Sequence, residues 1–295
     1  MSLWNFEAMS ILLSFDDELT GARRLARAAN LTAVTIERHR FPDGEIKLRL
    51  PAALPARVVI LRSLNDPNEK LIELLLAAQT ARGLGASHLT LVAPYLAYMR
   101  QDAAFRPGEV VSQRVIGRLL GELFDAVITV DPHLHRIATL DEAVPFARNV
   151  ALSAAPLIGH FIAMRNRRPM LVGPDAESAQ WVHVAATYNG LPWAVCRKTR
   201  RGDTDVEVEL PAEQIRDREV VLIDDVASSG HTLAAAARRL LASGATRVDA
   251  VVTHAVLAAD AGAVLRDAGI SEFWSTDTVP HESNAISIVP LIADA

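Results

Sequence analysis

The chain has 295 residues, of which 50% are hydrophobic and 22% are charged, and its formal net charge at pH 7 is −5. This length allows one large domain or two medium domains, each with its own hydrophobic core. Sequence-independent nucleic-acid binding requires a strongly basic face, so no nucleic-acid partner is expected for this weakly acidic chain. Cys196 is the single cysteine, which excludes a disulfide within the chain and gives no reason to expect secretion.

Charged residues interrupt the apolar runs well before the length that a membrane span requires, so no membrane partner is expected. Residues 1–16 lack the basic flank and apolar run of a signal peptide. A cytoplasmic protein is therefore the expectation.

Short apolar runs alternate with longer helical patterns along the chain. The runs predict strands at residues 57–61, 88–93, 126–130, 169–173, 219–223 and 248–253, and the patterns predict helices at residues 67–83, 112–123 and 232–242. The strands are continuously apolar rather than alternating, which is typical of parallel sheets covered by helices on both faces. The sequence therefore predicts an α/β protein with mostly parallel sheets flanked by helices.

Two of the predicted strands end alike, at Asp131 and at Asp224, which suggests two similar halves. A boundary within residues 145–153 divides the chain evenly. We expect an N-terminal domain at residues 1–147 and a C-terminal domain at residues 148–295, with the last strand packing back on the N-terminal domain.

Functional groups in parallel sheets lie just beyond the carboxyl ends of the strands. The most informative such segment is 224–232, where a buried strand ends at Asp224 and Asp225 and a turn rich in hydroxyls leads into a helix. Backbone N–H groups at a helix start, together with serine and threonine hydroxyls, bind phosphate well. The two acids can accept hydrogen bonds from adjacent sugar hydroxyls. Ribose 5-phosphate has a phosphate for the helix start and adjacent hydroxyls for the two acids. The alternative is a capped helix that follows two solvated acids.

A second polar segment follows the strand at 88–93. Arg100 offers a planar fork for phosphate oxygens, and Gln101 and Asp102 can recognise the edge of a base or a ribose. A polar loop with one surface ion pair is the alternative.

The segment Arg40–Glu45 contains Pro42 and Gly44, which indicate a turn. Phe41 could stack on a purine, and Asp43 and Glu45 could accept hydrogen bonds from its exocyclic amine. In isolation this segment is better explained as the tip of a hairpin.

Another strand ends at Asp131, and His133 follows it. A position at a strand end favours a functional role, and a histidine here could bind a nucleotide phosphate or a magnesium ion. A histidine pair such as His133 and His135 is, however, more often structural or at the surface. Between Cys196 and Asp203 lies a run of four cations in five residues, including Lys198 and Arg200. Such a run is usually a solvated loop, but a triphosphate would neutralise it.

These segments together resemble the phosphoribosyl diphosphate synthetase family, and most closely its archaeal-type branch. The resemblance runs nearly end to end and includes residues 105–109, 275–280 and 286–291. It implies two phosphoribosyltransferase-like domains and a ribose-phosphate diphosphokinase activity that converts ATP and ribose 5-phosphate to AMP and 5-phosphoribosyl 1-diphosphate. It also implies a Mg²⁺ cofactor, and a homo-oligomer of two or more subunits in which neighbours share the adenine site.

The resemblance assigns a role to each candidate residue. Catalytic roles fall to Lys198, Arg200 and His133, and metal binding falls to His133 and Asp175. ATP binding is expected from Phe41, Asp43, Glu45, Arg100, Gln101, Asp102 and His133. Ribose 5-phosphate binding is expected from Asp175, Asp224, Asp225, Ser228, Ser229, Gly230 and Thr232. The chain departs from the family at Glu177 and His231, where glycine is common, and at Ser229, where threonine is usual.

Two other functions share some of these features. A phosphoribosyltransferase that consumes the diphosphate shares segment 224–232, but it leaves Arg100 to Asp102 and a full first domain without a reason. A non-catalytic subunit that regulates true synthetases fits the departures at Glu177 and His231, but it has no need of His133, Lys198 and Arg200.

Overall fold

The computed structural model describes residues 10–134, 136–165, 168–200, 206–209 and 215–295, with the backbone alone at 197–200 and 206–209. The chain divides into two compact units, which we call the N-terminal domain (Met1–Leu152 with Val289–Ala295) and the C-terminal domain (Ser153–Ile288). Within the described ranges, no helix combines the length and the apolar character that crossing a membrane requires.

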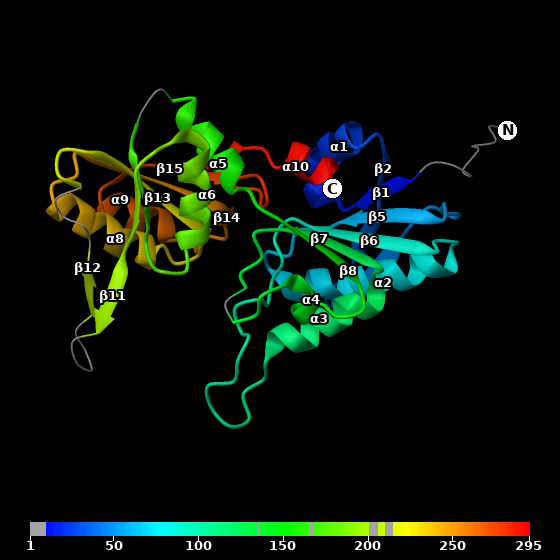
Figure 1. The fold of residues 1–295 in the computed structure, drawn as a ribbon. Coiled ribbons are helices and arrows are strands. Elements are labelled where there is room, and N and C mark those ends of the chain that lie inside the picture. The colour runs from blue at the N-terminus through cyan, green and yellow to red at the C-terminus, as the bar shows by residue number, and fades with distance from the viewer. Residues whose placement is uncertain (1–9, 135, 166–167, 201–205, 210–214) are drawn as a thin grey trace. The chain divides into compact units, whose positions relative to one another are not determined.

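A six-stranded sheet forms the centre of the N-terminal domain, in the order β2-β1-β5-β6-β7-β8, and all its pairings are parallel. Helices α1 and α10 lie on one face, and α2, α3 and α4 lie on the other (Figure 1). The strands are β1 (Ile11–Ser14), β2 (Thr32–Thr35), β5 (Arg57–Leu61), β6 (His88–Ala93), β7 (Ala126–Val130) and β8 (Arg148–Leu152). The helices are α1 (Leu19–Ala28), α2 (Pro67–Gly83), α3 (Ser112–Leu123), α4 (Leu140–Ala143) and α10 (Val289–Ala293).

The closing segment forms helix α10 rather than the strand that the sequence suggested, and it packs against α1. Pro290 is the second residue of this helix. Proline is tolerated in a first helical turn, whereas in a strand it would remove a donor from the ladder.

The C-terminal domain is built on a second six-stranded parallel sheet, in the order β10-β9-β13-β14-β15-β16. Helices α5 and α6 pack together, as do α8 and α9, and each pair covers one face of the sheet (Figure 1). The strands are β9 (Met170–Gly173), β10 (Trp193–Val195), β13 (Glu219–Ala227), β14 (Arg247–Ala255), β15 (Ile270–Thr276) and β16 (Asn284–Ile286). The helices are α5 (Ala155–Ala163), α6 (Ala179–Asn189), α8 (His231–Ala242) and α9 (Ala261–Asp267).

Two antiparallel hairpins stand outside the main sheets. In the N-terminal domain β3 (Glu37–Arg40) pairs with β4 (Ile46–Arg49), and in the C-terminal domain β11 (Arg197–Arg200) pairs with β12 (Val206–Glu209). Both carry residues that the sequence predicted as site residues.

The predicted fold class is confirmed, because both sheets are parallel and flanked by helices. Continuous burial of the central strands explains this result: all four residues of β1 and all four of β9 are buried. One boundary differs from the expectation. Strand β13 continues through Asp224 and Asp225 to Ala227, because its ladder with β14 extends to Ala255.

Candidate functional site

The carboxyl ends of β9 and β13 lie side by side in the C-terminal domain, because the two strands are direct neighbours in the sheet. Asp175 follows β9, and Asp224 and Asp225 lie in the last residues of β13. The structure therefore brings together the three acids that the sequence predicted for one site.

The turn from β13 to α8, residues 228–230, has the form that a phosphate-binding loop requires. Gly230 adopts a left-handed conformation with φ of 75°, and helix α8 begins directly after it without a side-chain cap. Ser229, His231 and Thr232 are exposed around this helix start. Because no side chain caps the first turn, its N–H groups and the dipole of α8 are available to an anion.

The neighbouring strand and helix hold this turn in place. The backbone N–H of Ala258 donates to the carbonyl of Ser228 at 3.0 Å. On the other side, a Cβ placed on Gly230 would lie 3.2 Å from the Leu265 Cδ2 atom of α9. Gly230 is thus required both for the backbone conformation and for the close approach of α9.

Carboxyl groups crowd together at the end of β13. Burial, followed by the Asp225 and Asp175 carboxylates, raises the pKa of Asp224 to about 9. The backbone N–H of Asp225 donates to Asp224 Oδ1 at 3.0 Å, which offsets only part of this effect. Crowded carboxylates of this kind favour a cation or several hydrogen-bond donors in the site.

Asp175 also shapes its own loop. Its Oδ1 accepts from the backbone N–H of Glu177 at 3.1 Å, and its carbonyl accepts from the Ser178 hydroxyl at 2.6 Å. Glu177 is exposed, so the departure from glycine at this position is accommodated at the surface.

The residues that the structure describes contain no group of three His, Cys, Asp or Glu side chains that could hold a metal ion by itself. A magnesium ion usually keeps several waters and binds only one or two carboxylates, so Asp175 and its neighbours on β13 offer suitable oxygen donors.

In the N-terminal domain, two loops lie side by side because β6 and β7 are neighbours in the sheet. The loop after β6 carries Arg100, whose side chain is exposed and has no ion-pair partner among the described residues. The loop after β7 carries His133, which is half-buried. An exposed guanidinium near a strand end is well suited to a phosphate.

Asp102 joins these two loops. Its carboxylate is completely buried and accepts from Arg136 Nη1 at 2.5 Å and from the Arg136 backbone N–H at 3.1 Å. This geometry makes Asp102 a residue that holds the loops together, and its expected contact with ATP stays a prediction. Gln101 Nε2 donates to the Ala103 carbonyl at 3.0 Å.

The hairpin β3–β4 places the three other residues predicted for ATP at its tip. The backbone N–H of Phe41 donates to the Glu45 carbonyl at 2.8 Å, and Asp43 Oδ1 accepts from the Glu45 N–H at 3.1 Å. Phe41 is 38% exposed, although it is a large aromatic residue. An exposed aromatic ring beside two exposed carboxylates is a suitable place for a base to stack.

Lys198 and Arg200 lie on strand β11, which pairs with β12. Their side chains lie outside what the structure describes, so the prediction of their roles rests on the sequence.

Sequence reasoning missed Arg136 and the charged residues Arg38, Arg62 and Glu73. These residues are paired with partners distant in the chain, such as Asp102 for Arg136, and no local pattern marks such pairs.

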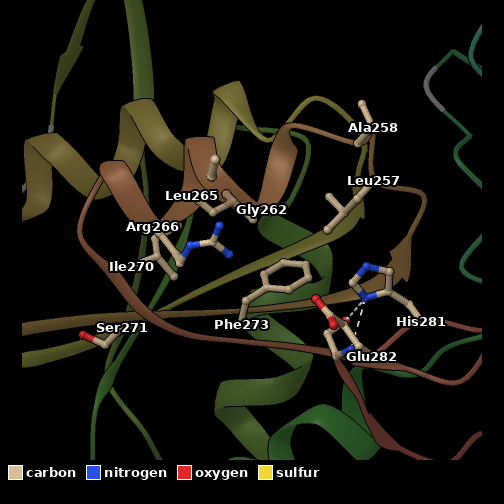
Figure 2. Close-up of a pocket in the computed structure, with 13 residues that line it drawn as sticks. Leu257, Ala258, Gly262, Leu265, Arg266, Ile270, Ser271, Phe273, His281 and Glu282 are labelled. Atoms are coloured by element: carbon tan, nitrogen blue, oxygen red, sulfur yellow. Dashed lines mark hydrogen bonds between the residues drawn. The ribbon is translucent and has the colours of Figure 1, made fainter.

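A pocket of about 650 Å³ lies elsewhere on the C-terminal domain, between α9, the start of β15 and residues 281–283. Arg266, Phe273, His281 and Glu282 converge on it (Figure 2). Leu265 lines this pocket and also approaches Gly230. None of the predicted site residues is among its described lining residues.

Two protein-family models match the chain. The model for the N-terminal domain of ribose phosphate pyrophosphokinase matches residues 10–123, and the model for the phosphoribosyl transferase domain matches residues 137–281. A ribose-phosphate pyrophosphokinase from Methanopyrus kandleri is 35% identical over 288 residues, which cover 97% of this chain and 98% of the relative. Ribose-phosphate pyrophosphokinase 2 from Archaeoglobus fulgidus is 36% identical over 273 residues, covering 92% and 95%.

Among solved structures, the phosphoribosylpyrophosphate synthetase from Mycobacterium smegmatis shares the fold, with a TM-score of 0.85 over 97% of each chain at 24% identity. Two phosphoribosyltransferase-like domains, with an acid pair ahead of the uncapped start of α8, place the chain in the class of proteins with the phosphoribosyltransferase fold. Within that class, the chain belongs to the ribose-phosphate pyrophosphokinase family.

Proposed function

We propose that this protein transfers the β,γ-diphosphate of ATP to the C1 oxygen of ribose 5-phosphate and releases AMP. One observation carries the proposal: the paired acids of β13 lead directly into an uncapped helix start with an exposed hydroxyl-rich turn, in a chain that matches ribose-phosphate pyrophosphokinases along nearly its whole length.

The C-terminal domain binds the sugar phosphate. The 5-phosphate lies on the turn formed by Ser228, Ser229 and Gly230 and on the Thr232 hydroxyl, where the N–H groups of α8 point at its oxygens. Asp224 and Asp225 then accept hydrogen bonds from the ribose hydroxyls.

The N-terminal domain binds the nucleotide. Arg100 and His133 bind the phosphates from two adjacent loops, and Gln101 recognises the nucleoside. The hairpin tip holds adenine, with Phe41 against its face and with Asp43 and Glu45 toward its amine. In the family that the chain resembles, this hairpin reaches into a neighbouring subunit, so we expect the active enzyme to be a homo-oligomer. We also expect it to be cytoplasmic.

The acids of the C-terminal domain fit a magnesium ion, because burial and the Asp225 and Asp175 carboxylates raise the pKa of Asp224, and a bound cation would stabilise its charged form. Asp175 would help to hold this ion, and His133 keeps the metal-binding role that the family resemblance assigns to it. When bound, magnesium neutralises charge on the phosphate oxygens.

The transfer itself is an in-line displacement. The C1 oxygen of the sugar forms a bond to the β-phosphorus of ATP, and the bond between that phosphorus and the oxygen shared with the α-phosphate breaks. AMP leaves with the electron pair, and the proton of the C1 hydroxyl is released. In such a reaction the protein contributes mainly positioning and charge stabilisation. Lys198 and Arg200 stabilise the charge that develops on the transferring group.

Gly230→Ala is expected to weaken ribose 5-phosphate binding at least tenfold and to lower the free energy of unfolding by about 1–2 kcal/mol. Both effects follow from the left-handed backbone and from the 3.2 Å approach of Leu265. Calorimetric titration and chemical denaturation measure them.

Gly190→Ala is the matched control, because Gly190 has φ of 60° with nothing within 4 Å of an added Cβ. It should lose stability but bind the sugar normally. Normal binding by Gly230→Ala would contradict the placement of the phosphate.

The function is tested by incubating the pure protein with ATP, Mg²⁺ and ribose 5-phosphate and separating the nucleotides by chromatography. AMP should form only when the sugar phosphate is present. A phosphoribosyltransferase would form no AMP but would consume 5-phosphoribosyl 1-diphosphate with a base. A non-catalytic subunit would do neither, and either of these results would reject the proposal.

A further inference from the structure

A cluster of buried charges lies beneath the hairpin β3–β4 in the N-terminal domain. Its centre, which we call the hairpin anchor, consists of Arg38, Arg62 and Glu73. Arg62 is 1% exposed and Glu73 is fully buried. Buried charges are costly unless they are paired, so such a cluster is uncommon without a purpose.

Glu73 of helix α2 connects two arginines from different elements. Its Oε1 accepts from Arg38 Nη1 of strand β3 at 2.5 Å, and its Oε2 accepts from Arg62 Nη2, directly after strand β5. One carboxylate thereby ties the hairpin to both a helix and a central strand of the domain.

The inner side of the anchor is rigidly held. Arg62 Nη1 donates to Asp17 Oδ1 at 2.6 Å and to Glu18 Oε2 at 3.1 Å, and the Arg62 guanidinium lies 4.4 Å from the centre of the Phe15 ring. Arg62, which these contacts hold in place, therefore fixes Glu73 from the core side independently of Arg38.

The hairpin depends on such links because its two strands form a separate sheet and pair only with each other. An isolated two-stranded hairpin is marginally stable in water. Arg38 also donates to Asp16 Oδ1 at 2.8 Å, and a more exposed ion pair joins Arg40 to Glu69 of α2. Leu48 adds an apolar contact with the core.

We propose that Arg38 is a positioning residue for ATP: through Glu73 it fixes the hairpin that presents Phe41, Asp43 and Glu45. Phe41 lies three residues beyond Arg38, so a change in the direction of β3 at the anchor moves the aromatic ring directly. This inference rests on the proposed function, in which the hairpin tip binds adenine.

The test compares Arg38→Gln with Arg49→Gln. The first change removes the link to Glu73 but leaves Glu73 paired with Arg62, so the buried carboxylate keeps one of its two arginine partners. The second removes an exposed ion pair with Glu37 that lies wholly within the same hairpin.

Arg38→Gln should raise the KM for ATP about tenfold or more, because small displacements of binding groups are costly. Its kcat and its KM for ribose 5-phosphate should stay within about twofold of the wild-type values. Arg49→Gln should change none of the three, and Arg38→Lys should restore part of the loss.

Hydrogen exchange of the hairpin amides gives a readout that does not depend on activity. Arg38→Gln should speed exchange at residues 37–49 and leave β5 and β6 unchanged, whereas Arg49→Gln should act less. An unchanged KM for ATP in an active Arg38→Gln enzyme, or equal losses for both substrates, would overturn the inference. An inactive wild-type protein would instead defeat the proposed function, and the exchange data would still decide whether Arg38 anchors the hairpin.

Discussion

Replacing Lys198 with alanine is expected to lower kcat by about 10²-fold or more, the usual effect of removing one donor that stabilises developing charge. Lys198 is one of four cations among residues 197–201, and with Arg200 it forms the Lys-x-Arg pair that the family resemblance assigns to catalysis. Ribose 5-phosphate binding should be nearly unchanged, because the proposed function places that substrate on the turn after β13. Steady-state kinetics and calorimetric titration measure the two quantities.

Arg197→Ala is the control for this prediction. It removes the same charge from the same strand but lies outside the Lys-x-Arg pair, so kcat should change by less than about threefold. A Lys198→Ala enzyme with near-normal turnover would defeat the catalytic assignment of the lysine.

The second large effect concerns Asp224. Asp224→Asn should raise the free energy of unfolding of the unligated protein at neutral pH by about 1–3 kcal/mol and should weaken ribose 5-phosphate binding by tenfold or more. The carboxylate is destabilised in the folded protein by burial and by Asp225 and Asp175, and asparagine removes that cost. The same change replaces one of the two oxygens that the proposed function gives to the sugar hydroxyls with an NH2 group, which can only donate.

The pH dependence follows from the direction of the shift. The folded pKa of Asp224 is about 9 and its ordinary value is 3.8, so between these values the folded protein binds more protons at this site than the unfolded protein does. Stability contributed by this group is present below pH 3.8 and is lost progressively as the pH rises toward 9. The difference between Asp224→Asn and wild type in chemical denaturation should therefore grow from about pH 5 to about pH 8.

Asp260→Asn serves as the control for Asp224→Asn. Asp260 is exposed and makes no side-chain cap on α9, so its substitution should change stability by less than about 0.5 kcal/mol at every pH. A constant difference between Asp224→Asn and wild type across the pH range would show that the half-buried, crowded carboxylate is not the source of the stability change.

The sequence was sufficient for the fold class because the signal is local. Continuously apolar runs such as residues 57–61 and 88–93 predict buried parallel strands, and the strands were found at those positions. The family resemblance assigned the acids after β9 and at the end of β13 to one site, and the structure places them on adjacent strands.

The sequence was less informative where function depends on pairs distant in the chain. In the sequence, Asp102 is one of three consecutive polar residues, Arg100 to Asp102. Its ion-pair partner, Arg136, lies 34 residues later, and the carboxylate of the pair is buried. Arg38 and Glu73 are 35 residues apart and meet only because the hairpin folds over α2. The extension of β13 was likewise missed, since it depends on pairing with β14 rather than on the residues of β13 themselves.

The central claim is that ATP is cleaved between its α- and β-phosphates and that both outer phosphates reach the sugar together. Phosphorus-31 NMR of the pure protein with ATP, Mg²⁺ and ribose 5-phosphate tests it directly. The ATP signals should be replaced by those of AMP and of a diphosphate attached to the sugar C1. Signals of ADP, or of free pyrophosphate formed without the sugar diphosphate, would contradict it.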